Sequence, residues 1–121
     1  MAVEVLNERV IRLPQGDTGM VRFVADEPVQ EADRGVFTVA RRDGRPVLRK
    51  IIAPDAEENS FFMAFTHKDT ASMRPDSYEW SFRIVRGGKF DETGRIMEAN
   101  WVSTGVLEGR MTVLAVAGGA R

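Results

Sequence analysis

The feature that most constrains how this chain can fold is a set of short runs in which large apolar residues occupy every second position. The clearest run is Tyr78–Ile84, where polar residues separate the large ones, and the runs Phe61–Phe65 and Val21–Ala25 alternate in the same way. Successive side chains of a β-strand point to opposite faces, so the large residues of each run share one face. The sequence therefore predicts strands that each bury one face.

Turn signals separate these runs at fairly regular spacing, which is typical of a β-sandwich or a β-barrel. Asp43-Gly44 lies between two β-prone segments and predicts a two-residue hairpin, because Gly tolerates the positive φ of such a turn. We expect strands over roughly residues 2–13, 19–26, 35–42, 45–53, 59–66, 77–87, 95–103 and 110–117.

One stretch, His67–Met73, lacks alternation and precedes Pro75. It predicts a single short helical turn that crosses between sheets, with Asp69 or Thr70 as a cap for its free backbone N–H groups. No apolar stripe of helical spacing exceeds two turns, so a layer of helices is not expected. We therefore expect an all-β sandwich of about seven to eight antiparallel strands, in one domain over residues 1–121, with a helical turn near 67–73.

Composition narrows the classes of function. The chain has 121 residues with 17 Lys and Arg against 18 Asp and Glu, and this balance gives no reason to expect nucleic acid or an anionic membrane as a partner. It has no cysteine, so we expect neither a disulfide framework nor a thiolate nucleophile. No signal-peptide pattern and no run of about 18 apolar residues is present, so we expect folding in a cytoplasm without membrane insertion.

The residues that usually carry chemistry are sparse. His67 is the single histidine, so it cannot form a multi-histidine metal site, and no Ser lies in a Gly-x-Ser-x-Gly elbow that would pair with it. The acidic clusters Asp55–Glu58 and Asp91-Glu92 do not have the spacing of a calcium loop, and we interpret them as solvated loops. We predict no catalytic residues, no cofactor and no metal.

Two places are possible interfaces. Arg41, Arg42 and Arg45 surround the expected hairpin tip, where they either meet an anionic partner or keep an exposed edge soluble. Trp101 lies where alternation is poorer, and it is a core residue, an interface anchor or a platform for stacking sugars.

The segment from Asp69 to Phe82 resembles the corner that leads into strand F of immunoglobulin-like domains. The resemblance implies that the Tyr78 hydroxyl bonds to the backbone within residues 69–76 and pins the crossover. Antibody domains have a Cys two residues after this Tyr, where this chain has Trp80, and Phe23 lies near the place of the other Cys. We expect Phe23 and Trp80 to share the core between the sheets and to replace the missing bridge. The alternative is an ordinary buried Tyr at the start of a strand.

A second resemblance covers nearly the whole chain. A Gly16–Gly19 turn leads into an apolar strand, Phe65–Ala71 and Pro75–Ile84 follow, and the chain closes on a Gly-led strand from Gly109 to Val113. This order is similar to small phage tail and baseplate proteins, above all to the amino-terminal immunoglobulin-like domain of baseplate upper proteins from phages of Gram-positive bacteria. Those proteins usually continue into a linker and a distal module, whereas this sequence ends at Arg121, so we do not expect a receptor-binding extension in it.

The resemblance implies a non-enzymatic structural or attachment module of a phage or prophage tail or baseplate. It implies contacts with other copies of the chain or with tail proteins, and a final location in the virion after assembly in the bacterial cytoplasm. Such parts usually assemble as symmetric homo-oligomers. The alternative is a carbohydrate-binding sandwich that uses Trp101 on an exposed face, either alone or with Tyr78 or Phe90.

Overall fold

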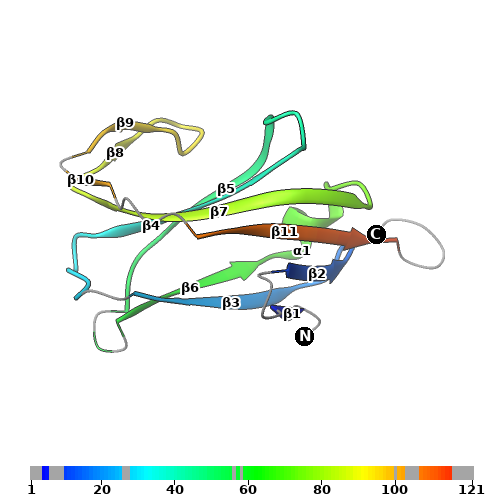
Figure 1. Cartoon of the computed structure of the whole chain (residues 1–121), viewed down its shortest axis with the longest axis horizontal. Coiled ribbons are helices and arrows are strands. Elements are labelled where there is room, and N and C mark those ends of the chain that lie inside the picture. Colours follow the sequence, from blue (N-terminus) through cyan, green and yellow to red (C-terminus); the bar gives the residue numbers. More distant parts are fainter. Residues whose placement is uncertain are drawn as a thin grey trace.

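The structure is a computed structural model that describes residues 4–5, 10–25, 28–55, 57, 59–99, 101–102 and 107–115. Within these residues it consists of two facing sheets, a small hairpin and one short helix (Figure 1). The elements are β1 (Glu4–Val5), β2 (Val10–Pro14), β3 (Gly19–Val24), β4 (Arg34–Ala40), β5 (Pro46–Ile52), β6 (Ser60–Phe65), α1 (His67–Ala71), β7 (Asp76–Arg86), β8 (Lys89–Phe90), β9 (Ile96–Glu98), β10 (Trp101–Val102) and β11 (Leu107–Leu114).

The larger sheet has the strand order β1-β2-β11-β7-β4-β5, and β10 pairs with the far end of β7. β7 lies between β4 and β11 and is antiparallel to both, with Phe82 opposite Phe37 on one side and opposite Leu107 on the other. β3 and β6 form a separate antiparallel pair, in which Phe23 faces Phe61 across the ladder. Figure 1 shows this pair as a layer facing β4, β7 and β11.

The core lies between the two layers and is built from the alternating runs of the sequence. β3 buries every second residue, from Val21 to Phe23, and β7 buries Tyr78, Trp80 and Phe82 on the same principle. The fully or nearly fully buried apolar residues of this cluster are Ile11, Leu13, Val21, Phe23, Phe37, Val39, Phe61, Met63, Phe65, Met73, Tyr78, Trp80, Phe82, Met111 and Val113. The prediction of an all-β sandwich with one short helical turn near 67–73 is confirmed.

Three details of the prediction are wrong. The sandwich is not wholly antiparallel, because β2 and β11 run parallel, with Ile11 opposite Met111. The expected strand 95–103 is divided into β9 and β10, which pair with different partners, and β8 is an additional short strand. The expected strand 2–13 is divided in the same way, because β1 folds back antiparallel onto β2.

The hairpin between β4 and β5 also differs from the expected two-residue turn. Its loop has three residues, Arg42 to Gly44, because the Arg41 N–H donates to the Arg45 carbonyl at 2.9 Å and the Gly44 N–H donates to the Arg41 carbonyl at 2.8 Å. Gly44 has φ of 88°, which is the left-handed conformation that closes three-residue hairpins of this kind. The Gly in the sequence thus marked the hairpin but not its length.

Candidate interaction surfaces

The two aromatic residues expected to replace a disulfide lie together between the sheets. The ring centroids of Phe23 and Trp80 are 5.8 Å apart, and both side chains are buried. Phe23 also stacks on Phe82 at 4.1 Å and lies 5.9 Å from Phe37. Phe23 therefore joins the small sheet to the centre of the large one, together with Phe61 and Phe65 of β6, which contact Phe82 and Phe37, and its role is structural.

The corner before β7 has the bond implied by the immunoglobulin-like resemblance. The Tyr78 hydroxyl donates to the Arg74 carbonyl at 2.7 Å. Burial and the negative charge of Asp76 raise the pKa of Tyr78. The hydroxyl thus stays protonated as a donor, and the tyrosine ties the start of β7 to the chain segment that follows α1.

The cap of α1 corrects one expectation. The N-cap residue is Thr66, whose hydroxyl accepts from the Asp69 N–H at 3.2 Å, while the Asp69 carboxylate accepts from the Thr66 N–H at 2.8 Å. This is a reciprocal capping box, so Asp69 stabilises the helix start from its third position instead of beginning it, and Thr70 is not a cap. Asp69 also forms an ion pair with Lys50 of β5.

Sequence reasoning missed a set of bonds that dock the turn after β2 onto α1. The buried Gln15 side chain donates to the Met73 carbonyl at 2.8 Å, and the Thr70 hydroxyl donates to the Asp17 carbonyl at 2.7 Å. A ring nitrogen of His67 lies 2.6 Å from the Gly16 carbonyl. The one histidine of the chain thus serves this contact between the turn and α1. The partners are more than 50 residues apart in sequence, so no local sequence pattern predicts these bonds.

An ion pair between a buried carboxylate and a half-buried arginine holds the opposite end of the sandwich. Asp33 has no exposed surface, and its carboxylate accepts from Arg86 Nε at 2.8 Å and from Arg86 Nη2 at 3.0 Å. Its second oxygen also accepts from the Gln30 N–H at 2.9 Å. The hydrogen bonds from Arg86 hold the pKa of Asp33 below its ordinary value, although burial acts against them. This geometry is a structural clamp between the loop before β4 and the end of β7.

Among the possible interface arginines, Arg45 already forms an ion pair within the chain. Its guanidinium bonds to the Asp43 carboxylate at 2.8 Å within the hairpin tip, and the hydrogen bonds from Arg45 lower the pKa of Asp43. Arg42 is exposed and takes part in no ion pair within the described residues. The backbone of Trp101, in β10, pairs with that of Arg86 in β7. The side chain of Trp101 lies outside the described part of the structure.

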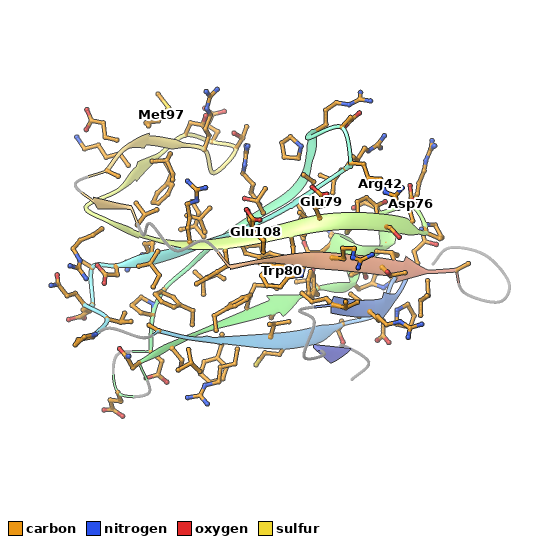
Figure 2. The ribbon with its side chains drawn as sticks, in the orientation of Figure 1. Arg42, Asp76, Glu79, Trp80, Met97 and Glu108 are labelled. Carbon is orange, nitrogen blue, oxygen red and sulfur yellow. The ribbon has the colours of Figure 1, made fainter. Side chains whose placement is uncertain are left out.

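The tip of this hairpin meets the corner before β7 around a shallow hollow of about 300 Å³. Figure 2 shows Arg42 and Asp76 close to one another at this end of the molecule. The hollow is lined by Arg41, Arg42, Asp43, Arg74, Asp76, Ser77 and Tyr78. Tyr78 is the buried member of this set, so the hollow lies directly over the corner.

The outer face of the β3–β6 pair is unusually apolar for a surface. Met20 is 50% exposed, Phe62 42% and Val24 59%, and Ala64 is exposed opposite Met20. Arg22 lies between them with its guanidinium carbon 5.5 Å from the centroid of the Phe62 ring, a cation–π geometry. We call these five residues the small-sheet face. The alternation of the sequence predicted the buried rows of β3 and β6. It did not predict that the outward rows of these strands are also largely apolar.

The outer face of the larger sheet is polar and carries both signs of charge. Glu79 lies opposite Arg110 in the β7–β11 register, and Glu108 lies opposite Ser81. A hollow of about 420 Å³ lies over this face between β4, β7 and β11. Figure 2 labels Glu79, Trp80 and Glu108 from its lining. The β8–β9 hairpin folds over the other end of the same face, where Gly94 comes close to Arg49 and Ile51. This face resembles an ordinary solvated sheet surface.

Within the described residues, no group of three or more His, Cys, Asp or Glu side chains is placed to hold a metal ion. In the same part of the chain, no helix has the length and hydropathy needed to span a membrane. Comparison of the chain with protein-family models, with curated proteins and with solved structures finds no match.

Proposed function

We propose that this chain is a non-enzymatic structural or attachment module of a phage or prophage tail or baseplate, working through protein–protein contacts. Its partners are other copies of the chain or other tail proteins, and its final location is the virion. The observation that carries the proposal is the small-sheet face, an exposed apolar row on Met20, Phe62 and Val24. Contiguous apolar patches on a protein surface mark contacts with other proteins.

The immunoglobulin-like assignment is part of this proposal. The order β11-β7-β4-β5 facing β3-β6 corresponds to strands G, F, C and C′ facing B and E of such domains. The hydrogen bond from Tyr78 to Arg74 supports the same assignment, because a tyrosine at this corner is one of its hallmarks. The tail and baseplate role depends on the resemblance in the sequence, with which this strand order agrees.

The apolar strand that closes the sequence is not the surface for self-association. β11 is internal, lying between β2 and β7 with Met111 and Val113 buried. The surface that favours association is therefore the small-sheet face. The sheet of β3 and β6 has only two strands among the described residues.

The carbohydrate-binding alternative gains no support from the described side chains. Tyr78 is buried in the core and its hydroxyl is bonded to Arg74, so it offers no stacking face. Phe90 is partly buried, and Gly88 lies close to its ring.

Light scattering of the purified chain at micromolar concentration tests the contact. We expect a trimer or hexamer, as tail symmetry favours, or else a dimer, with a contact of at least about 1,000 Å² in total. Phe62→Glu places a charge on the small-sheet face and should reduce the mass to that of a monomer. Met97→Glu is the matched control, because Met97 is 64% exposed but lies on the β8–β9 hairpin (Figure 2).

Mass spectrometry of phage particles induced from the source strain tests the tail assignment directly. We expect peptides of this chain in purified particles, at a copy number consistent with a ring or fibre. A monomer in solution combined with absence from the particles would contradict the proposal.

A further inference from the structure

The hollow over the corner is rich in arginine from two segments far apart in sequence. Arg41 and Arg42 come from the β4–β5 hairpin, and Arg74 comes from the segment between α1 and β7. In the part of the chain that the structure describes, none of the three takes part in an ion pair. Three arginines that form no ion pair among the described residues therefore line one small volume.

The two carboxylates around the hollow do not cancel this charge. Asp43 is already neutralised by Arg45, which holds it through two contacts of 2.8 Å. Asp76 accepts from the Ser77 N–H at 2.8 Å and is the single acidic group left to face the arginines. Three positive groups against one negative group leave the hollow with a net positive charge.

The buried tyrosine beneath the hollow shows that these charges converge. Burial and the charge of Asp76 raise the pKa of Tyr78, and the charges of Arg41 and Arg74 oppose that rise. Both arginines are therefore close enough to act on the same hydroxyl, although they lie on different segments of the chain. A ligand over Tyr78 would meet both at once.

The chemistry of the hollow selects one class of partner. Guanidinium groups bind carboxylates through paired, charge-assisted hydrogen bonds. A nucleic acid would extend beyond the hollow over a chain whose net charge is −1, which does not favour its long phosphate backbone. A short acidic segment needs only the positive charge of the hollow itself. We propose that this hollow docks an acidic segment of a partner protein, whose carboxylates pair with Arg41, Arg42 and Arg74. The inference rests on the proposed function in taking the partner to be a protein.

Fluorescence anisotropy with a labelled oligoglutamate peptide tests the inference. The parent chain should bind the peptide at low salt, and binding should weaken as salt is raised because the contacts are exposed. Arg42→Glu/Arg74→Glu should weaken binding by about tenfold or more, since it turns attraction into repulsion at the hollow. Both side chains are exposed, so the variant should melt close to the parent.

Arg12→Glu/Arg95→Glu is the matched control. Both arginines are exposed and lie outside the hollow, and the change in net charge is the same. This variant should retain the binding of the parent within about twofold. Equal weakening in both variants would overturn the inference, because the effect would then come from net charge alone. No binding of the peptide by the parent would overturn it as well.

An oligothymidylate of similar length distinguishes a protein partner from a nucleic acid. Tighter binding of that oligonucleotide than of oligoglutamate, lost in Arg42→Glu/Arg74→Glu, would also overturn the inference. The outcome is separable from the proposed function, which light scattering and particle analysis test without use of the hollow. If the chain is present in the particles but does not bind oligoglutamate, the inference is contradicted and the proposed function is not.

Discussion

Gly35 of β4 is tightly surrounded, both by a side chain of its own sheet and by one of the facing sheet. A Cβ atom placed on Gly35 would lie 2.6 Å from one ring carbon of Phe82 and 3.0 Å from a ring carbon of Phe61. The Phe82 ring also stacks on Phe23 with an interplanar angle of 8°, so it has no room to retreat. The glycine is needed for space, and its backbone has no left-handed φ.

We therefore expect Gly35→Ala to lower the free energy of unfolding by about 1–3 kcal/mol, the range for overpacking a core. Urea denaturation measures the change. Phe82→Leu in the same chain should make Gly35→Ala less costly, because the smaller side chain frees the space that the new methyl group needs. Costs that simply add in the double variant would show that the two residues do not compete for this space.

Asn59 has a role that depends on both its backbone and its side chain. It is the single described non-glycine residue with a positive φ, at 50°. Its side-chain oxygen accepts from the Val29 N–H at 2.7 Å, and its side-chain nitrogen donates to the Ala25 carbonyl at 3.0 Å. One residue before β6 thus holds both sides of the loop that follows β3.

Two substitutions separate these roles. Asn59→Gly retains the backbone conformation and loses the two side-chain bonds, which should cost about 1–3 kcal/mol of unfolding free energy. Asn59→Ala loses the same bonds and adds the strain of a left-handed residue, about 1 kcal/mol more. Equal melting temperatures for the two variants would show that the backbone conformation contributes nothing.

At the scale of elements, the corner that joins β6 to β7 is held by five side chains. Thr66 and Asp69 cap α1, Gln15 and Thr70 bind the turn after β2 to it, and Tyr78 closes the far side. The bonds of Thr66, Asp69, Gln15 and Tyr78 use backbone groups of the crossover, whereas Thr70 donates to the Asp17 carbonyl of the turn after β2. Side chains thus pair backbone groups of the crossover that no sheet ladder pairs.

Tyr78→Phe tests the closing bond alone. The aromatic ring stays in the core, so only the bond to the Arg74 carbonyl is lost, and the expected cost is about 1 kcal/mol. Thermal melting measures this cost, and hydrogen exchange of residues 69–76 should quicken more than that of β3. An unchanged melting temperature with uniform exchange would show that the corner does not depend on this bond.

Local patterns explain which elements the sequence predicts well. Strands β3, β6 and β7 follow from period-two alternation, and the Tyr78 corner follows from an arrangement of neighbours in sequence. The parallel β2–β11 pair, the bond from Gln15 to Met73 and the ion pair from Asp33 to Arg86 join residues more than 50 positions apart. No periodicity encodes such partners, and the same holds for the hollow, whose arginines come from two segments.

At the scale of the whole molecule, two ion pairs stabilise the packing of distant elements. Asp33 binds Arg86 at one end of the sandwich, and Asp69 binds Lys50 where the helix meets β5. Burial tends to raise the pKa of Asp69, but bonds from Lys50 and Thr66 outweigh it and lower that pKa overall. The pKa of Asp33 is lowered as well, chiefly by hydrogen bonds from Arg86.

These lowered pKa values predict sensitivity to acid. An unfolded aspartate titrates near 3.8, and both groups titrate lower in the folded chain, so the stability that they add is present above that pH. It is lost as the pH falls through the folded pKa values. Asp33→Asn should cost about 1–3 kcal/mol at neutral pH and progressively less below about pH 4.

Urea denaturation across a series of pH values measures this dependence. Glu92→Gln is the control, because Glu92 is an exposed carboxylate in the turn between β8 and β9. Its stability curve should run parallel to that of the parent. A constant difference between Asp33→Asn and the parent at every pH would show that the charge of Asp33 is not what the clamp uses.

The parallel pairing of β2 with β11 has a mechanical consequence. The register aligns five pairs, from Val10 with Arg110 to Pro14 with Leu114. Because the two strands run in the same direction, the chain enters β2 at one end of their shared ladder and leaves β11 at the other. Tension between these two points would load the rungs in shear, so that they must fail together, whereas a hairpin would open one rung at a time.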